Sequence, residues 1–135
     1  MQKQNVVVSL PKKLGIKPGF TVSVLNAPSG FLEKLAATMH QAQIITSDVP
    51  NADIIHYFAS SSDTLEEEFP RLKMLLGKPH ALWVSWPKKI SGIPSDLNEN
   101  IVRSFGLQNG LVDVKVASID ESWSGLKFVY RLKDR

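Results

Sequence analysis

The chain has 135 residues, of which 43% are hydrophobic and 21% are charged, values typical of one folded domain rather than a disordered chain. It contains no cysteine, which excludes disulfides, thiolate catalysis and cysteine-ligated metals. The net charge is only +3, from 16 basic against 13 acidic residues, so the charge permits binding of anions or nucleic acid without requiring it.

No stretch approaches the roughly 18 consecutive apolar residues of a membrane span. The first apolar run, Asn5–Ser9, is too short for the apolar region of a signal peptide. We therefore expect a cytoplasmic protein with a single domain over residues 1–135 and no membrane partner.

The first third of the chain predicts a helical turn, a strand and a helix. The turn is Pro11–Gly15, with proline near its start and glycine at its end. The β-rich run Thr21–Leu25 is typical of a buried strand, and Asn26–Gly30 breaks it. Apolar residues at helical spacing follow over Phe31–Met39, with Ser29 as the expected N-cap.

Two further strands are predicted at Gln43–Ser47 and Asp53–Ala59. Only Asp48–Ala52 separates them, whereas parallel strands normally need a longer crossover. Either this connection runs extended across the sheet, or the earlier strand is antiparallel or irregular.

The next helix begins at Ser60–Asp63 and carries Leu65, Phe69, Leu72 and Leu76, and Pro70 predicts a kink or a restart within it. The apolar run Ala81–Trp86 predicts a fourth strand.

The last third predicts a helix and a hairpin. Ser95 or Asp96 is expected to cap the helix, with Ser95 and Glu99 forming a local capping arrangement, and Gly106 or Gly110 ends it. Alternating valines over 112–116 predict a half-buried strand, and a turn at 120–122 leads to a last strand through 126–132.

Strands that alternate with helices predict an α/β fold, a three-layer Rossmann-like sandwich. We expect a mostly parallel sheet with a C-terminal antiparallel hairpin.

Three segments resemble a family of small soluble bacterial proteins that has no assigned function. They are WVSWPKK at 83–89, DLNEN at 96–100 and ESWSGLKFV at 121–129. This resemblance implies family membership but no chemistry.

Other segments resemble class I S-adenosylmethionine-dependent methyltransferases. They are LGIKPGFTVSVLNAPSGF at 14–31, ADIIHYF at 52–58 and LLGKPHALWVSWP at 75–87. The resemblance implies a methyltransferase-like fold with the strand order 2-1-3-4-6-5. It also places Asp48 where an acidic residue would meet the ribose of the cofactor. However, the family's cofactor loop needs several glycines, and only Gly30 remains here, with Pro28 in the middle. We therefore expect no cofactor.

Ligands of open α/β sheets bind beyond the carboxyl ends of the strands. The candidate crevice accordingly lies between the loops after the first and fourth strands, where it could hold a small molecule or an anion. Its candidate residues are Asn26, Ser29, Gly30, Asp48, Trp86, Lys88 and Lys89. Alternatively, the first loop is only a tight turn and the second a solvated loop above a packed Trp86.

The remaining motifs are expected to be structural, with no catalytic and no metal-binding residue. His40, His56 and His80 lack the spacing of metal ligands, and His56 is expected to be a hydrogen-bonded core histidine. Ser85 and Lys88 spell S-x-x-K, but on a strand end rather than the helix that this acyl-transfer motif needs.

Two features of the last strand bear on function. Lys127, Arg131, Lys133 and Arg135 alternate, forming either a nucleic-acid-binding stripe or an exposed strand face, and we favour the exposed face. Trp123 is expected to close the core against the third main helix, near Phe105 or Leu107.

The leading functional hypothesis is a ligand- or partner-binding module without catalysis. An S-adenosylmethionine-dependent methyltransferase-like enzyme and a nucleic-acid-associated protein remain the alternatives. Whether the chain is an enzyme, and its oligomeric state, stay open at this stage.

Overall fold

The computed structural model describes residues 8–135, so the apolar run Asn5–Ser9 lies mostly outside the described residues. The described chain forms one six-stranded sheet of order β2-β1-β3-β4-β6-β5. Strands β1 to β4 pair in parallel, and β6 pairs antiparallel to both β4 and β5. The predicted fold class, strand order and C-terminal hairpin are confirmed.

The elements follow the predicted sequence of strands and helices closely. The strands are β1 (Thr21–Leu25), β2 (Gln43–Ile45), β3 (Ile54–Phe58), β4 (Ala81–Pro87), β5 (Leu111–Ser118) and β6 (Trp123–Tyr130). The helices are α1 (Leu10–Leu14), α2 (Phe31–Thr38), α3 (Ser62–Leu75) and α4 (Glu99–Gln108), with short 3-10 turns η1 (Lys89–Ser91) and η2 (Leu132–Asp134).

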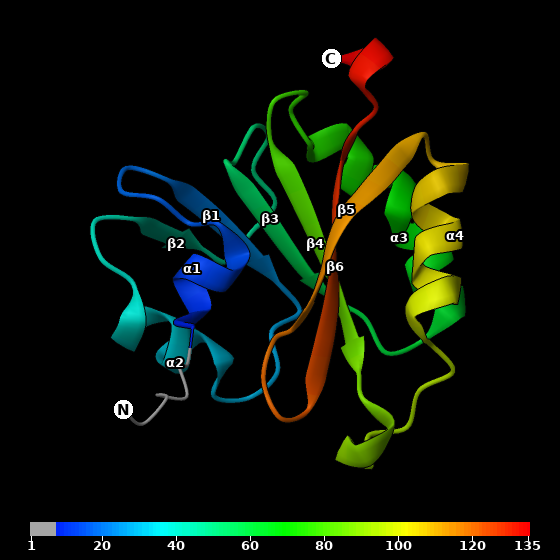
Figure 1. The fold of residues 1–135 in the computed structure, drawn as a ribbon, viewed down its shortest axis with the longest axis horizontal. Helices are drawn as coiled ribbons and strands as arrows, with labels where there is room; N and C mark the ends of the chain where they lie inside the picture. Colours follow the sequence, from blue (N-terminus) through cyan, green and yellow to red (C-terminus); the bar gives the residue numbers. More distant parts are fainter. Residues whose placement is uncertain (1–7) are drawn as a thin grey trace, which may run out of the picture.

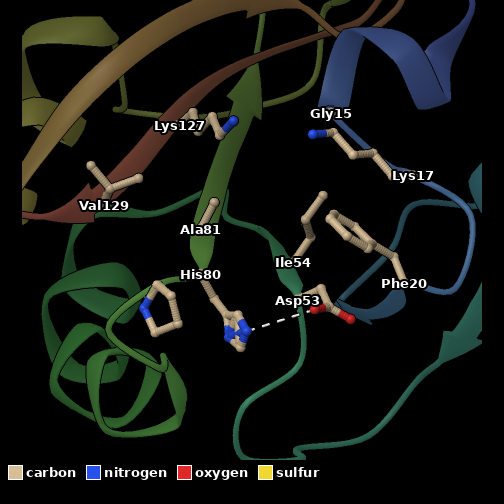
Figure 2. Close-up of a pocket in the computed structure, with 10 residues that line it drawn as sticks. Gly15, Lys17, Phe20, Asp53, Ile54, His80, Ala81, Lys127 and Val129 are labelled. Carbon is tan, nitrogen blue, oxygen red and sulfur yellow. Dashed lines mark ion pairs between the residues drawn. The ribbon is translucent and has the colours of Figure 1, made fainter. Parts of the chain in front are cut away.

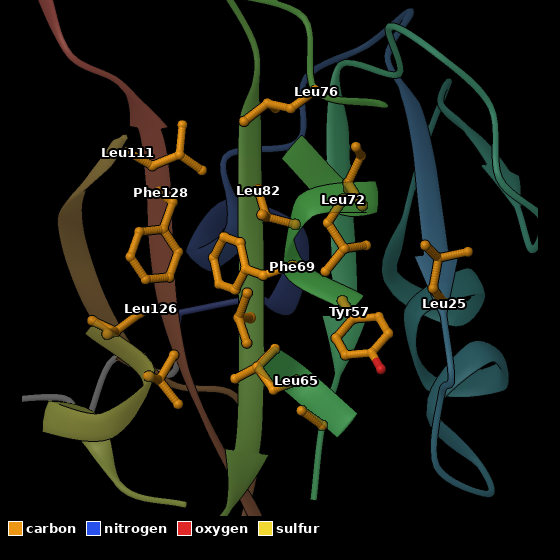
Figure 3. Packing of buried hydrophobic residues seen from close by; sticks show 14 of the residues in the cluster. Leu25, Tyr57, Leu65, Phe69, Leu72, Leu76, Leu82, Leu111, Leu126 and Phe128 are labelled. Atoms are coloured by element: carbon orange, nitrogen blue, oxygen red, sulfur yellow. The ribbon is translucent and has the colours of Figure 1, made fainter. Parts of the chain in front are cut away.

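Helices cover both faces of the sheet (Figure 1). On one face, α3 and α4 bury Leu65, Phe69, Leu72 and Val102 against the central strands (Figure 3). On the other face, α1 and α2 pack on a second layer of buried residues: Leu10, Leu14, Val22, Val24, Phe31, Leu35, Ile54, Phe58, Trp83, Ile119 and Trp123. Burial of both faces explains why β3 and β4 are continuous apolar runs rather than alternating ones.

The short connection from β2 to β3 bends at Ser47 and turns at Pro50–Asn51, where Asn51 is left-handed with a φ of 62°, so the expected extended path is wrong. The alternative of an antiparallel β2 is also wrong, because β2 pairs in parallel with β1. The hydroxyl of Ser23 donates to the carbonyl of Ser47 at 2.9 Å, and the N–H of Asn51 donates to the carbonyl of Leu75 at 3.0 Å. Val49 packs on the core between these two anchors. The connection can be short because β2 pairs with β1 over only three residues and needs no crossover helix.

Two predicted helix caps are wrong. Gly30, not Ser29, is the N-cap of α2; its φ of 86° is left-handed, and no side chain caps the helix. The N-cap of α4 is Asn98, whose side chain accepts from the N–H of Ile101 at 2.9 Å. Asp96 instead bonds to the start of α3, whose N-cap is Ser61, and accepts from the N–H and hydroxyl of Ser62 at 2.8 and 2.6 Å.

The capping arrangement expected between Ser95 and Glu99 does not form. Ser95 accepts from the N–H of Leu97 at 3.1 Å, and Glu99 pairs with Arg103 at 2.6 Å. Spacing alone could not separate these partners because several polar residues precede α4 at similar offsets.

Helix α3 is one continuous helix through Pro70, so of the two alternatives expected there, a kink or a restart, the restart does not occur. Helix α4 likewise continues through Gly106, one of the two glycines expected to end it. A Cβ at Gly106 would lie 2.1 Å from the ring of Phe128, so this glycine allows β6 to approach the helix closely.

The half-buried alternation predicted for β5 is wrong. Val114 and Val116 are 55% and 52% exposed, and the register shifts between Asp113 and Lys115. A bulge on this edge strand breaks the period of two and turns the valines outward.

Neither the nucleic-acid-binding stripe nor the favoured exposed strand face forms from Lys127, Arg131, Lys133 and Arg135 together, because β6 ends at Tyr130. Beyond that end, Arg131 pairs with Asp134 at 3.1 Å, and Arg135 donates to the carbonyl of Tyr130 at 2.8 Å.

Candidate functional site

The loops after β1 and β4 lie at the same edge of the sheet, as predicted. Strands β1, β3 and β4 run parallel, with β3 between the other two. We call this the carboxyl edge. It also holds the turn between β5 and β6, because β5 pairs antiparallel to β6 and β6 antiparallel to β4.

The loop after β1 is shaped by two left-handed residues. Asn26 has a φ of 61°, and its side-chain amide donates to the carbonyl of Phe58 at 3.4 Å, which ties the loop to the end of β3. Gly30 is left-handed at the start of α2, and Pro28 accepts from the N–H of Phe31 at 3.1 Å. The first turn of α2 therefore begins without a side-chain cap at this edge.

A pocket of about 480 Å³ opens between this loop and the turn from β5 to β6. We call it the carboxyl-edge pocket. Ser29 and Gly30 line it, whereas the other candidate residues do not. The full lining is Pro28, Ser29, Gly30, Phe31, Lys34, Ile93, Asp120, Ser122 and Trp123.

Asp120 organises one wall of the carboxyl-edge pocket. One carboxylate oxygen accepts from the N–H groups of Ser122 and Trp123 at 2.8 and 2.9 Å. The other lies 3.4 Å from the ammonium of Lys34 on α2. The lining thus combines an ion pair with apolar groups, including Phe31.

The candidate residues after β4 hold the fold together. The ammonium of Lys88 donates to the hydroxyl of Ser118 at 2.6 Å and to the carbonyl of Asp120 at 2.7 Å. Trp86 is buried in the core beneath α3 and α4, and Lys89 is exposed at the start of η1. Lys88 therefore clamps the hairpin turn, and the alternative of a packed Trp86 below this loop matches the geometry.

Asp48 lies on the connection after β2 and is held by α3. Its carboxylate accepts a hydrogen bond from Arg71, which also pairs with Glu68 at 2.6 Å. Hydrogen bonds to Glu68 and Asp48 raise the pKa of Arg71. Asp48 is therefore part of a surface ion-pair network and lies outside the carboxyl-edge pocket.

Trp123 is 8% exposed and packs edge-on against Phe58, with ring centroids 5.1 Å apart. The expectation that it is buried is confirmed, but its expected neighbours are wrong: it lies in the layer with α1 and α2 rather than against α4. The cause is the alternation of β6, which turns Phe128 toward α4 and Trp123 to the opposite face.

His56 is a hydrogen-bonded core histidine, as predicted. Its Nε2 lies 2.7 Å from the hydroxyl of Ser85, both side chains are fully buried, and its ring stacks on Phe58 with centroids 4.3 Å apart. Burial lowers the pKa of His56 to about 3, opposed by the charge of Asp120. Ser85 therefore faces His56 in the core, while Lys88 reaches the hairpin turn, so the two do not form an acyl-transfer pair.

Within residues 8–135 no cluster of three or more His, Cys, Asp or Glu side chains could hold a metal ion. None of the described helices is both long and apolar enough to cross a membrane.

The fold is that of S-adenosylmethionine-dependent methyltransferases. A methyltransferase from Aquifex aeolicus matches with a TM-score of 0.64 and 17% identity, over 87% of this chain and 85% of that one. A tRNA methyltransferase from B. subtilis matches with a TM-score of 0.62 and 11% identity, over 98% of this chain and 69% of that one. Magnesium protoporphyrin IX methyltransferase from Synechocystis, with bound S-adenosylmethionine, matches with a TM-score of 0.60 and 13% identity, over 84% of this chain and 71% of that one.

No family model matches the chain, and no curated protein matches it. At identities of 11 to 17% the structural matches establish the fold alone.

The residues at the carboxyl edge do not fit the cofactor loop that this fold family implies. The only glycine is Gly30, at the end of the loop, and Pro28 has no N–H to offer a ligand. The acidic residue expected at the ribose, Asp48, accepts from Arg71 instead. We therefore derive no reaction step through that cofactor.

A second pocket, which the sequence did not predict, lies at the opposite edge of the sheet (Figure 2). Its ionisable lining residues are Lys17, Asp53, His80 and Lys127. They are far apart in the sequence. The pairing of Ile54 on β3 with Ala81 on β4 brings Asp53 and His80 to one edge, and the pairing of Trp83 with Lys127 adds β6 beside them. No local motif marks such a site.

Proposed function

We propose that this protein is a ligand-binding module on a methyltransferase-like scaffold, which holds a small molecule in the carboxyl-edge pocket and does not catalyse a reaction. The observation that carries the proposal is the pocket of about 480 Å³ between the start of α2 and the hairpin turn. Its volume is within the range of small-molecule sites, and its position is the edge where open α/β sheets bind ligands.

The lining supports a ligand of mixed polarity. The first turn of α2, with Lys34 one turn further on, favours an anionic group at one end. Phe31, Ile93 and the edge of Trp123 offer apolar surface for the rest of the molecule. Lys34 and Asp120 are paired with each other at 3.4 Å.

The second candidate is an S-adenosylmethionine-dependent methyltransferase. The shared fold of the three methyltransferases favours it, and Pro28 and the Asp48–Arg71 contact oppose it. The two candidates differ in affinity for the cofactor. We expect S-adenosylmethionine to bind with a Kd above about 10 μM, so that its binding free energy is weaker than roughly −7 kcal/mol.

Isothermal titration with S-adenosylmethionine and S-adenosylhomocysteine tests this directly. It is combined with a thermal-shift screen of nucleotides, amino acids and simple anions, since ligands that bind the folded state raise the Tm. Ser29→Trp fills the pocket from an exposed position, and Ser104→Trp on α4 is the matched control on the other face.

We expect at least one compound of the screen to raise the Tm of the native protein and of Ser104→Trp but not of Ser29→Trp. If the native protein binds the cofactor with a Kd below about 10 μM and Ser29→Trp does not bind it, the methyltransferase candidate is favoured over the binding module. A positive compound whose effect Ser29→Trp leaves intact would contradict the assignment of the pocket.

A further inference from the structure

We propose that the second pocket, at the edge where β1, β3 and β4 begin, binds a small organic oxyanion between Lys17 and Lys127. We call it the amino-edge pocket. The site is independent of the proposed function, because the two pockets lie at opposite ends of the strands and share no lining residue.

The amino-edge pocket has a volume of about 350 Å³, enough for a small organic molecule. Ile54 and Ala81 at the starts of β3 and β4 line its middle, and Gly15 closes one side as the C-cap of α1. Lys127 reaches in from β6, and Lys17 from the loop after α1 (Figure 2).

The cationic wall consists of Lys17 and Lys127, whose side chains extend toward one another in Figure 2. Within the described part of the chain neither ammonium has a carboxylate partner: every ion pair there involves other residues. Lys127 is only partly exposed, and its ammonium would lie 3.5 Å from a Cβ at Gly15.

The surroundings of Lys127 disfavour its own charge. Burial lowers the pKa of Lys127, and the charges of Lys115 and Lys17 lower it further. An anion placed between the two ammonium groups would relieve this repulsion and replace lost hydration with hydrogen bonds. The pocket therefore holds positive charge that the described chain leaves uncompensated.

The pocket also contains one carboxylate, which is engaged away from the lysines. One oxygen of Asp53 accepts from the N–H of Thr21 at 2.8 Å, and the other lies 3.6 Å from Nε2 of His80. This pair lies on the opposite side of the pocket in Figure 2. Asp53 therefore holds the start of β1 and does not neutralise Lys17 or Lys127.

The rest of the lining indicates an organic rather than an inorganic anion. Phe20, Ile54 and Val129 present apolar surface between the cationic wall and the Asp53–His80 pair. Two neighbouring cations favour a phosphate monoester over a carboxylate, because the phosphate carries more charge near neutral pH. An aryl or alkyl phosphate matches both the charge and the apolar surface.

The test is an amide NMR titration of the full chain with phenyl phosphate, benzoate and uncharged benzyl alcohol. We expect saturable shifts at Gly15, Phe20 and Ala81, with phenyl phosphate binding more tightly than benzoate and benzyl alcohol causing none. Lys127→Met and Lys17→Met should each weaken phenyl phosphate binding about tenfold or more. Lys89→Met removes the same charge at the carboxyl edge and should change the affinity less than about twofold.

Thermal melts verify that each variant is folded, and exposed Lys17 can be replaced with little risk to the core. Three results would overturn the proposal. They are the absence of saturable shifts up to about 20 mM phenyl phosphate, equal affinity in Lys127→Met, and shifts centred on Gly30 and Phe31 instead. The last result would place the anion in the carboxyl-edge pocket and support the proposed function, so the two proposals fail separately.

Discussion

The lysines at the two edges of the sheet differ in whether the protein supplies them with partners. At the carboxyl edge, Lys34 pairs with Asp120 and Lys88 donates to Ser118 and to the Asp120 carbonyl. At the amino edge, Lys17 and Lys127 face one another without a carboxylate partner in the described chain. The fold family directs attention to the first edge, whereas the uncompensated charge is at the second.

Fold and charge are therefore separate indications of where a ligand could bind. The topology places a pocket at the carboxyl edge, but there the protein's own groups satisfy most of the charges. A pocket at an edge where this fold does not usually bind ligands can still hold charges that the protein leaves unpaired.

The largest effect is expected at the carboxyl edge from Trp123→Ala. Trp123 packs on Phe58 and is 8% exposed, so its truncation should cost about 3–5 kcal/mol of unfolding free energy. Urea denaturation measures the cost. An unchanged midpoint together with lost ligand binding would make Trp123 a ligand platform rather than part of the core.

The second effect concerns His56, which lies in the buried layer between the two edges. Burial lowers the pKa of His56 from 6.5 to about 3, so the unfolded chain takes up a proton between these pH values while the folded chain does not. Stability should therefore fall as the pH drops below 6.5, by roughly 2 kcal/mol at pH 5.

His56→Gln is the matched variant, because its amide can still bond to Ser85 but does not titrate. Urea midpoints from pH 7 to pH 5 should fall less steeply for this variant than for the native chain. Parallel slopes for the two proteins would show that His56 is not the group responsible.

The smallest effect is expected from Arg71→Met, which removes the partner of Asp48. The pair is largely exposed, so the loss should be less than about 1 kcal/mol. The variant also frees the carboxylate that the fold family would use at a ribose. Titration of Arg71→Met with S-adenosylmethionine should still give no micromolar binding, because Pro28 remains; tight binding would show that Arg71 alone blocks a cofactor site.

The α/β fold class could be predicted from the sequence because apolar runs alternate with capped helices, and the strand order followed from the resemblance to methyltransferases. β1 was located to the residue, since Thr21–Leu25 is bounded by turn residues on both sides. Periodicity failed at β5, where a bulge turns Val114 and Val116 outward, because such a bulge is set by the pairing with β6.

The sites were less predictable than the fold. Ser29 and Gly30 could be assigned to the carboxyl-edge pocket from their position after β1, whereas Lys88 has the right location but points its charge into the hairpin turn. The amino-edge pocket escaped prediction because Lys17 and Lys127 meet only through the tertiary register. Sequence patterns report on local backbone and burial, and they do not report which distant charges remain unpaired.

The contrast between the edges is tested most directly by comparing the Tm of Lys88→Met and Lys127→Met without ligand. Both substitutions remove one positive charge and keep an unbranched side chain. Lys88→Met should lower the Tm, because it removes the hydrogen bonds to the Ser118 hydroxyl and the Asp120 carbonyl. The loss in unfolding free energy should be about 1 kcal/mol. Lys127→Met should raise the Tm, because it removes a charge that burial and two neighbouring lysines disfavour. A lower Tm for Lys127→Met would contradict the account, since it would mean that the protein itself compensates this lysine.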